Sequence, residues 1–123
     1  MTERRFTVAE AEVALAAIRP RLPDIRDARR TMLETAERVR GAVESDGGGH
    51  HPGAGYRSAQ QLLAREVEKV AREGVLLRDV DPALLDFPAE RDGEAVFLCW
   101  REPEPAIAWW HPVDAGFGGR RPL

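Results

Sequence analysis

Residues 85–101, LDFPAERDGEAVFLCWR, decide the fold because they predict a β-hairpin together with its register. Asp92-Gly93 is a strong signal for a two-residue hairpin turn, since such turns need residues that accept positive φ angles. With this loop, the strands 85–91 and 94–101 pair residue by residue and end with Leu85 opposite Trp100. Because side chains alternate between the two faces of a strand, one face collects Leu85, Phe87, Ala89, Val96, Leu98 and Trp100. That face is predicted to be core.

A third strand is predicted over residues 106–111, after the proline-containing connection at 102–105. If Arg101 pairs with Ala106, the apolar face gains Ile107, Trp109 and His111. The opposite, outer face carries Asp86, Pro88, Glu90, Phe97, Cys99, Arg101 and Trp110. Because a merely solvated face would not hold so many apolar groups, we expect the tail, a partner chain or a ligand to cover it.

The residues before the sheet predict a long helix. Thr7 and Glu10 have the spacing of a capping box. Apolar residues then recur every three or four positions, at Ala11, Leu15, Ile18, Leu22, Ile25, Ala28, Met32, Ala36, Val39 and Val43. Such a narrow stripe is typical of a coiled-coil seam. Pro20 and Pro23 each remove a helical donor, but the stripe keeps its phase across them. A kinked continuous helix is therefore favoured over a break.

A second, shorter helix is predicted to follow, with Ser58 as its N-terminal cap, Glu73 as its end and Gly74 as its left-handed C-terminal cap. At about 1.5 Å per residue the first helix spans about 55 Å and the second about 24 Å. Part of the first seam must therefore be covered by the sheet or by a second copy of the chain.

Together these patterns predict one α+β domain over residues 1–123. A long antiparallel helical hairpin (7–73, with a glycine-rich connector at 45–57) packs on a small three-stranded antiparallel sheet with a folded-back C-terminal tail (75–123).

Composition excludes several classes of function. The 18 Lys and Arg against 21 Asp and Glu give a net charge of -3, which argues against a general nucleic-acid partner. No stretch approaches the roughly 20 apolar residues that cross a bilayer, and the start lacks the apolar run of a signal peptide. We therefore expect no membrane partner and a cytoplasmic location. The single cysteine, Cys99, is taken to exclude both an internal disulfide and a cysteine zinc site.

Candidate ligand-binding residues gather on the outer face and in the tail: Asp86, Arg91, Cys99, Arg101, Trp110, His111, Asp114 and Arg120. Arg101 offers the two-pronged donor geometry that suits a carboxylate or phosphate, although an ion pair with Asp86 is favoured. The tail carries Phe117 among glycines, so it is expected to fold back and bring Arg120 near Asp86 or Glu90. Whether it only closes the face or builds an anion pocket from Arg101, His111 and Arg120 stays open.

Two further sets of residues suggest chemistry. Cys99 with Asp86 and His111 suggests nucleophilic catalysis, but the predicted register places His111 on the inner face, so a buried structural cysteine is favoured. A one-residue slip in the 102–105 loop would reverse that objection. His50-His51 suggests a transition-metal site, but a solvent-exposed loop is favoured. No catalytic residue, metal or cofactor is therefore predicted.

Several blocks of the chain resemble a known family. They are 6–11 (FTVAEA), 74–75 (GV), 78–81 (RDVD), 85–89 (LDFPA), 91–93 (RDG), 96–101 (VFLCWR), 109–111 (WWH) and 116–122 (GFGGRRP). Together they resemble the bacterial family called domain of unknown function 2203 over nearly all of the 123 residues. The resemblance implies a small bacterial cytoplasmic protein and supplies no activity.

The leading hypothesis is a non-enzymatic assembly or interaction module that forms a homodimer through the long helix. Replacing Leu22 or Ile25 with Asp is then expected to dissociate the dimer. The alternative is a protein that binds a small anionic ligand or a metal, or a minor enzyme, through the outer sheet face and the tail.

Overall fold

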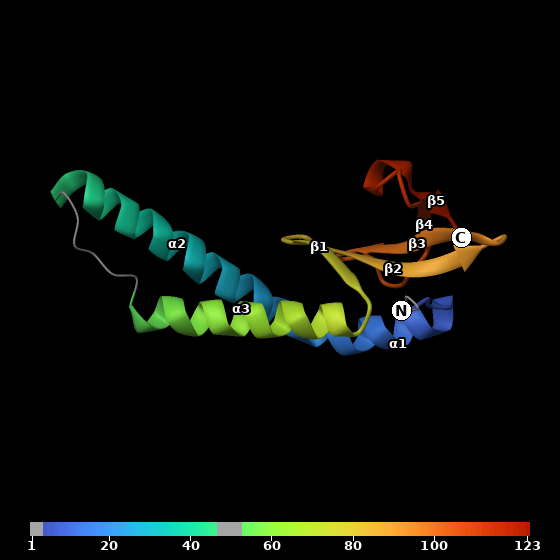
Figure 1. Ribbon diagram of the computed structural model, residues 1–123, viewed down its shortest axis with the longest axis horizontal. Coiled ribbons are helices and arrows are strands. Elements are labelled where there is room, and N and C mark those ends of the chain that lie inside the picture. The colour runs from blue at the N-terminus through green and yellow to red at the C-terminus, as the bar shows by residue number, and fades with distance from the viewer. Residues whose placement is uncertain (1–3, 47–52) are drawn as a thin grey trace.

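The computed structural model describes residues 4–46 and 53–123 and has the α+β architecture predicted (Figure 1). The helices are α1 (Val8–Ile18), α2 (Leu22–Asp46) and α3 (Ala54–Arg72), with a single 3-10 turn, η1 (Arg19–Arg21), between α1 and α2. The sheet lies above α1, and the α2–α3 hairpin projects away from it. The molecule therefore has a compact sheet body and a helical arm.

The first helical path is continuous from Val8 to Asp46, as the phase of the seam predicted. It opens with the predicted capping box, in which the Glu10 amide donates to Thr7 Oγ1 (3.1 Å) and the Thr7 amide to Glu10 Oε1 (2.9 Å). Pro20 lies in η1 and Pro23 in the first turn of α2. A missing N–H costs least there, because first-turn donors have no helical acceptor.

The second helix begins earlier than predicted. Gly53, with φ of 88°, precedes the first residue of α3, so the prediction that Ser58 caps this helix is wrong. Tyr56, within the first turns, lines a groove together with Val39 of α2, so these turns lie beside α2. Gly74 has φ of 86° and ends the helix as expected. His50 and His51 lie outside the described residues.

Within the described residues the sheet has five antiparallel strands in sequence order, so the prediction of three is wrong. They are β1 (Leu76–Val80), β2 (Ala83–Arg91), β3 (Glu94–Arg101), β4 (Trp109–Pro112) and β5 (Arg121–Pro122). The strand β5 has only two residues and pairs with Trp109 and Trp110 of β4. It forms because the tail returns to the sheet. A segment of two residues is too short to show the alternation of apolar and polar residues that predicts a strand.

The predicted hairpin register is confirmed, with Leu85 opposite Trp100 and Asp86 opposite Cys99. The register of β4 differs by one residue from the prediction, because Cys99 pairs with Trp109 rather than Arg101 with Ala106. The connection absorbs the extra residue in a turn that the Glu104 amide closes on the Arg101 carbonyl oxygen (2.8 Å). As a result His111 lies on the outer face, beside Cys99, where the sequence placed it on the inner one.

This shift also exchanges the tryptophans. Trp109 joins the outer face with Cys99, and Trp110, opposite Leu98, joins the inner face and packs against the core. The predicted apolar residues of β2 and β3 are all buried on the inner face.

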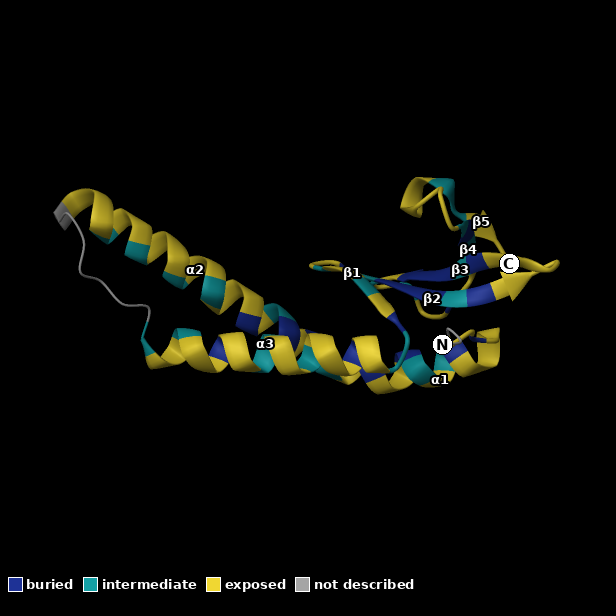
Figure 2. Cartoon of the chain, viewed as in Figure 1, coloured by how far each residue is buried: buried dark blue, intermediate teal, exposed yellow. Residues whose placement is uncertain are grey.

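The helical seam divides into two parts (Figure 2). The proximal seam is buried in the sheet body and comprises Ala11, Leu15, Ile18, Leu22, Ile25 and Ala28. The distal seam lies on the projecting part of α2, is half-buried or exposed, and comprises Met32, Ala36, Val39 and Val43. Leu22 and Ile25 are 1% and 0% exposed. Replacing either residue with Asp would disrupt the core of a single chain and would not report on a dimer. A test of dimer dissociation therefore needs a substitution in the distal seam.

Candidate functional site

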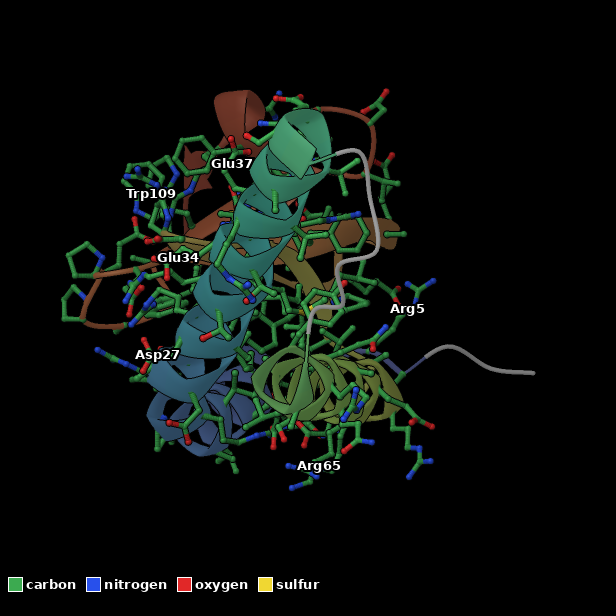
Figure 3. All side chains as sticks on the ribbon, turned by 90° about the vertical axis from the view of Figure 1, so that its left-hand side faces the viewer. Arg5, Asp27, Glu34, Glu37, Arg65 and Trp109 are labelled. Carbon is green, nitrogen blue, oxygen red and sulfur yellow. The ribbon has the colours of Figure 1, made fainter. Side chains whose placement is uncertain are left out.

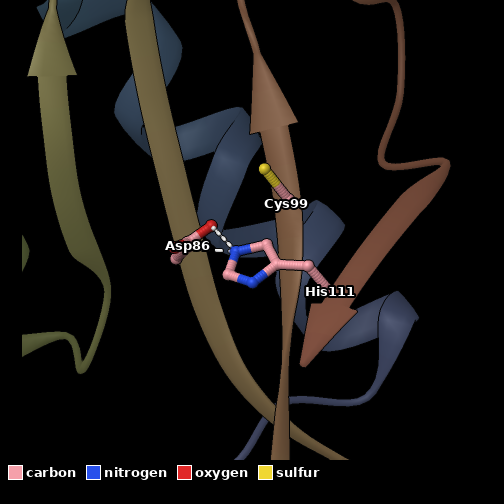
Figure 4. Close-up of side chains that lie close together, drawn as sticks. All are labelled: Asp86, Cys99 and His111. Atoms are coloured by element: carbon pink, nitrogen blue, oxygen red, sulfur yellow. Dashed lines mark hydrogen bonds and ion pairs between the residues drawn. The ribbon is translucent and has the colours of Figure 1, made fainter. Parts of the chain in front are cut away.

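Three polar side chains meet on the outer face of the sheet (Figure 4). Asp86, Cys99 and His111 come from the neighbouring strands β2, β3 and β4, and one potential ligand atom of each lies within 4.8 Å of the others. Their exposures are 3%, 0% and 2%. We call this group the outer-face cluster. It exists because Asp86 faces Cys99 directly and the register of β4 brings His111 beside them.

The His111 ring is fixed at both nitrogens. Its Nδ1 lies 2.7 Å from the Pro112 carbonyl oxygen, and its Nε2 lies 3.1 Å from both carboxylate oxygens of Asp86. A carbonyl only accepts hydrogen bonds, so Nδ1 carries a hydrogen. The contact with Asp86 then needs a second proton, held between Nε2 and the carboxylate. The pair is either imidazolium with carboxylate or imidazole with carboxylic acid.

Asp86 has a further partner at the edge of the sheet. Arg78 of β1 donates from Nε to Asp86 Oδ2 (3.0 Å), and its guanidinium lies 5.2 Å from the centre of the Phe97 ring. The sequence favoured Arg101 as the partner of Asp86, but Arg101 instead lies 5.6 Å from the Phe117 ring and is exposed. Arg78 was missed because a β-bulge between Leu77 and Asp79 redirects it.

Cys99 is held as a neutral thiol. The pKa of Cys99 is raised to about 12, chiefly by burial and next by the negative charge of Asp86. The positive charge of Arg120 opposes this rise, and a hydrogen bond to Asp86 adds to it. Because both nitrogens of His111 already have oxygen partners, that ring is not placed to take the thiol proton. The geometry therefore gives no activated nucleophile.

The tail covers part of the outer face, through β5 and the 3-10 turn η2 (Phe117–Gly119) above the sheet in Figure 1. Arg120 donates from Nη2 to both carboxylate oxygens of Glu104 (2.7 Å each) and to the Cys99 carbonyl oxygen (3.4 Å). Its guanidinium also lies 5.0 Å from the Trp109 ring. The prediction that Arg120 lies near Asp86 or Glu90 is wrong, because Arg120 pairs with Glu104. Glu104 was missed because it belongs to the misjudged loop.

The other candidates are dispersed. The guanidinium of Arg91 lies 4.7 Å from the centre of the Trp110 ring, on the inner face of the sheet. Asp114 is exposed in the segment between β4 and η2. Arg101, His111 and Arg120 each have separate partners. Of the eight candidate residues, the structure thus gathers Asp86, Cys99 and His111 around one point.

The family resemblance is confirmed by comparison with family models. Residues 4–123 match the family described as "Uncharacterized conserved protein (DUF2203)". The chain belongs to this family. Comparison with curated proteins and with solved structures found no match. Across residues 4–46 and 53–123, none of the DUF2203 chain's helices combines the length and apolar character that a membrane crossing needs.

Proposed function

We propose that this DUF2203 protein is a cytoplasmic homodimerising assembly module whose interface is the projecting α2–α3 arm. One observation carries the proposal: the distal seam continues the spacing of the proximal seam but is covered only in part. Val43 of this seam is 41% exposed, and Leu33, which lies outside the seam on the same arm, is 55% exposed. Apolar side chains repeated along one helical face favour burial against another helix.

The two helices leave a groove that supports this interpretation. It has a volume of about 300 Å³ and is lined by Ala36, Val39, Arg40 and Tyr56. Figure 1 shows α2 diverging from α3 toward the end of the arm. The helices of one chain therefore do not fully cover each other, and helices from a second copy would complete a four-helix bundle.

The charges on the arm are compatible with self-association. Glu37 is paired with Arg40 and Asp27 with Arg30 within the same helix, so neither pair needs a partner across an interface. Viewed along the arm, Glu34 and Glu37 lie on the flank of α2 away from α3 (Figure 3). In a two-fold dimer the same patch meets itself, and an apolar strip flanked by internally paired charges suits such contact.

The test is the mass of the protein in solution, with Val43→Asp as the disrupting variant. Val13→Asp is the matched control, because Val13 is an exposed valine (73%) on α1, away from the arm. Light scattering at tens of micromolar should give a dimer for the wild type and Val13→Asp, and a folded monomer for Val43→Asp. A monomeric wild type, or dissociation caused equally by both variants, would contradict the proposal.

The alternative function, binding of a small ligand or metal on the outer face, rests on a separate observation. The outer-face cluster combines three buried donor groups that the dimer does not use. This arrangement suits a cation better than an anion, since Asp86 lies in it and Arg120 is paired with Glu104.

A further inference from the structure

We propose that Asp86, Cys99 and His111 bind a divalent transition-metal ion, with zinc as the expected occupant. The inference goes beyond dimerisation and involves a different part of the molecule. It departs from the prediction of no metal, for which His50 and His51 were the ligands considered, and from the expectation that one cysteine excludes a cysteine zinc site. The β4 register instead brings His111 beside Asp86 and Cys99.

The spacing of the donor atoms suits a small ion. Zinc lies about 2.0–2.1 Å from imidazole nitrogen and carboxylate oxygen, so two such ligands at tetrahedral angles are about 3.3 Å apart. His111 Nε2 lies 3.1 Å from each carboxylate oxygen of Asp86. The three donor atoms lie within 4.8 Å of one another, so a small movement of the Cys99 sulfur completes the set.

The surroundings already orient these donors. His111 donates its Nδ1 hydrogen to the Pro112 carbonyl oxygen (2.7 Å), which directs Nε2 at the other two groups. Zinc-binding histidines usually have such a partner on the second nitrogen. Arg78 donates to Oδ2 of Asp86 (3.0 Å) and so helps to fix the carboxylate, both oxygens of which lie 3.1 Å from His111 Nε2.

The donor types and charges select the metal. Thiolate, imidazole and carboxylate together suit zinc and its neighbours, whereas magnesium and calcium prefer oxygen ligands alone. Metal binding would release the Cys99 thiol proton and the proton held between His111 and Asp86 to solvent. The resulting thiolate and carboxylate would neutralise a doubly charged ion in this buried position. Three protein ligands also leave a fourth position for water.

Access is provided at the edge of the sheet. Arg78 belongs to the edge strand β1, and its side chain is 45% exposed although it contacts the buried Asp86. Rotation of this long side chain opens a path to the carboxylate without unfolding a strand.

The first experiment titrates chelator-treated, full-length protein with cobalt and with zinc. Cobalt should bind at one equivalent and give a thiolate-to-cobalt charge-transfer band, and zinc should displace it. Cys99 is the only cysteine in the chain, so this band identifies the ligand without any variant. Absence of binding, or a bound cobalt ion without the band, would overturn the proposal.

Two variants then distinguish metal binding by the outer-face cluster from metal binding by His50 and His51 of the connector. Cys99→Ser should weaken zinc binding by about 100-fold or more, since even outer-shell partners of metal sites change affinity by about 10–100-fold. The double variant His50→Ala/His51→Ala should bind as the wild type does. The reverse result, loss in the double variant and retention in Cys99→Ser, would overturn the proposal. If Cys99→Ser does not fold, the cobalt spectrum of the wild type decides.

Discussion

The proximal and distal seams have the same apolar spacing along one helical path, but only the proximal seam lies under the sheet. Leu15, Ile18 and Ile25 are at most 1% exposed, whereas Val43 is 41% exposed. A fully buried leucine or isoleucine contributes about 1.5–3 kcal/mol relative to an exposed one. The same pattern therefore contributes most of its free energy in the body and little in the isolated arm.

Charge pairs differ between the two parts in the same way. Near the proximal seam, Arg21 donates from Nε to Glu66 (2.7 Å), and the two side chains are only 20% and 15% exposed. On the arm, Glu37 and Arg40 are 69% and 66% exposed. Solvent-exposed pairs contribute about 0–1 kcal/mol. Periodicity thus marks which face of a helix is apolar, but its partner decides how much stability that face supplies.

The largest expected effect comes from truncating the same residue type in the two parts. Leu15→Ala should lower the free energy of unfolding by about 3 kcal/mol, within the range of about 2–5 kcal/mol for buried leucine truncations. Leu33→Ala, at a position 55% exposed, should change it by less than about 0.5 kcal/mol. Urea denaturation at dilutions where the chain is monomeric measures both values.

Equal losses in the two variants would show that the arm is packed as tightly as the body. Repeating the Leu33→Ala measurement at high concentration separates a loss within one chain from a loss of dimer, because only the second depends on concentration.

The next effect concerns the Arg21–Glu66 pair, where α3 is held to the proximal part of the first helical path. Glu66→Gln should lower stability by about 1–2 kcal/mol at neutral pH, because it replaces a charge-assisted hydrogen bond. Glu68→Gln is the matched control, since Glu68 is on the same helix and 62% exposed. Its effect should stay below about 0.5 kcal/mol.

The pH dependence has a defined sign. The hydrogen bond from Arg21 lowers the pKa of Glu66 below its ordinary value of 4.5 in the folded state. The stabilisation that this pair contributes is therefore fully present above pH 4.5. It is lost as pH falls through the lowered folded-state pKa. The difference between wild type and Glu66→Gln should therefore shrink on acidification. A difference that grows in acid would contradict the assignment.

The sequence predicted those parts of the fold that short-range rules determine. Asp92-Gly93 fixed the β2–β3 register because a two-residue turn leaves no slack, and Thr7 with Glu10 fixed the helix start. The 102–108 connection has no such constraint. The predicted register of β4 was therefore wrong by one residue, which placed His111 on the inner face. Since strand faces alternate, this single residue separated the three members of the outer-face cluster.

Long-range partners were beyond local rules. Arg78 reaches Asp86 through a bulge in an edge strand, and Glu104 meets Arg120 across 16 residues of chain. The charge and size of these residues are visible in the sequence. Their pairing depends on how β1 and the tail return to the sheet, which neither spacing nor composition specifies.

A smaller effect is expected at the start of the proximal helix. Thr7→Ala removes the acceptor for the Glu10 amide and should cost about 1 kcal/mol, as is usual for N-cap truncation. Thr31→Ala makes the same change inside α2, where alanine has the higher helix propensity, and should be neutral or slightly stabilising. Thermal denaturation compares the two. A loss at Thr31 as large as that at Thr7 would indicate an unrecognised role for the mid-helix hydroxyl.

The smallest effect has the opposite sign and lies on the arm. A Cβ added at Gly41 meets nothing within 4 Å, so Gly41→Ala should stabilise the protein by about 0.5–1 kcal/mol through helix propensity alone. Gly74→Ala should instead destabilise it, because Gly74 has φ of 86° and the new Cβ would lie 3.1 Å from Arg4 Cβ. Denaturant midpoints of the two variants test this directly. A destabilising Gly41→Ala would mean that the arm depends on the absence of a side chain there, as a closely packed dimer interface would, and light scattering of that variant would show whether the dimer is lost with it.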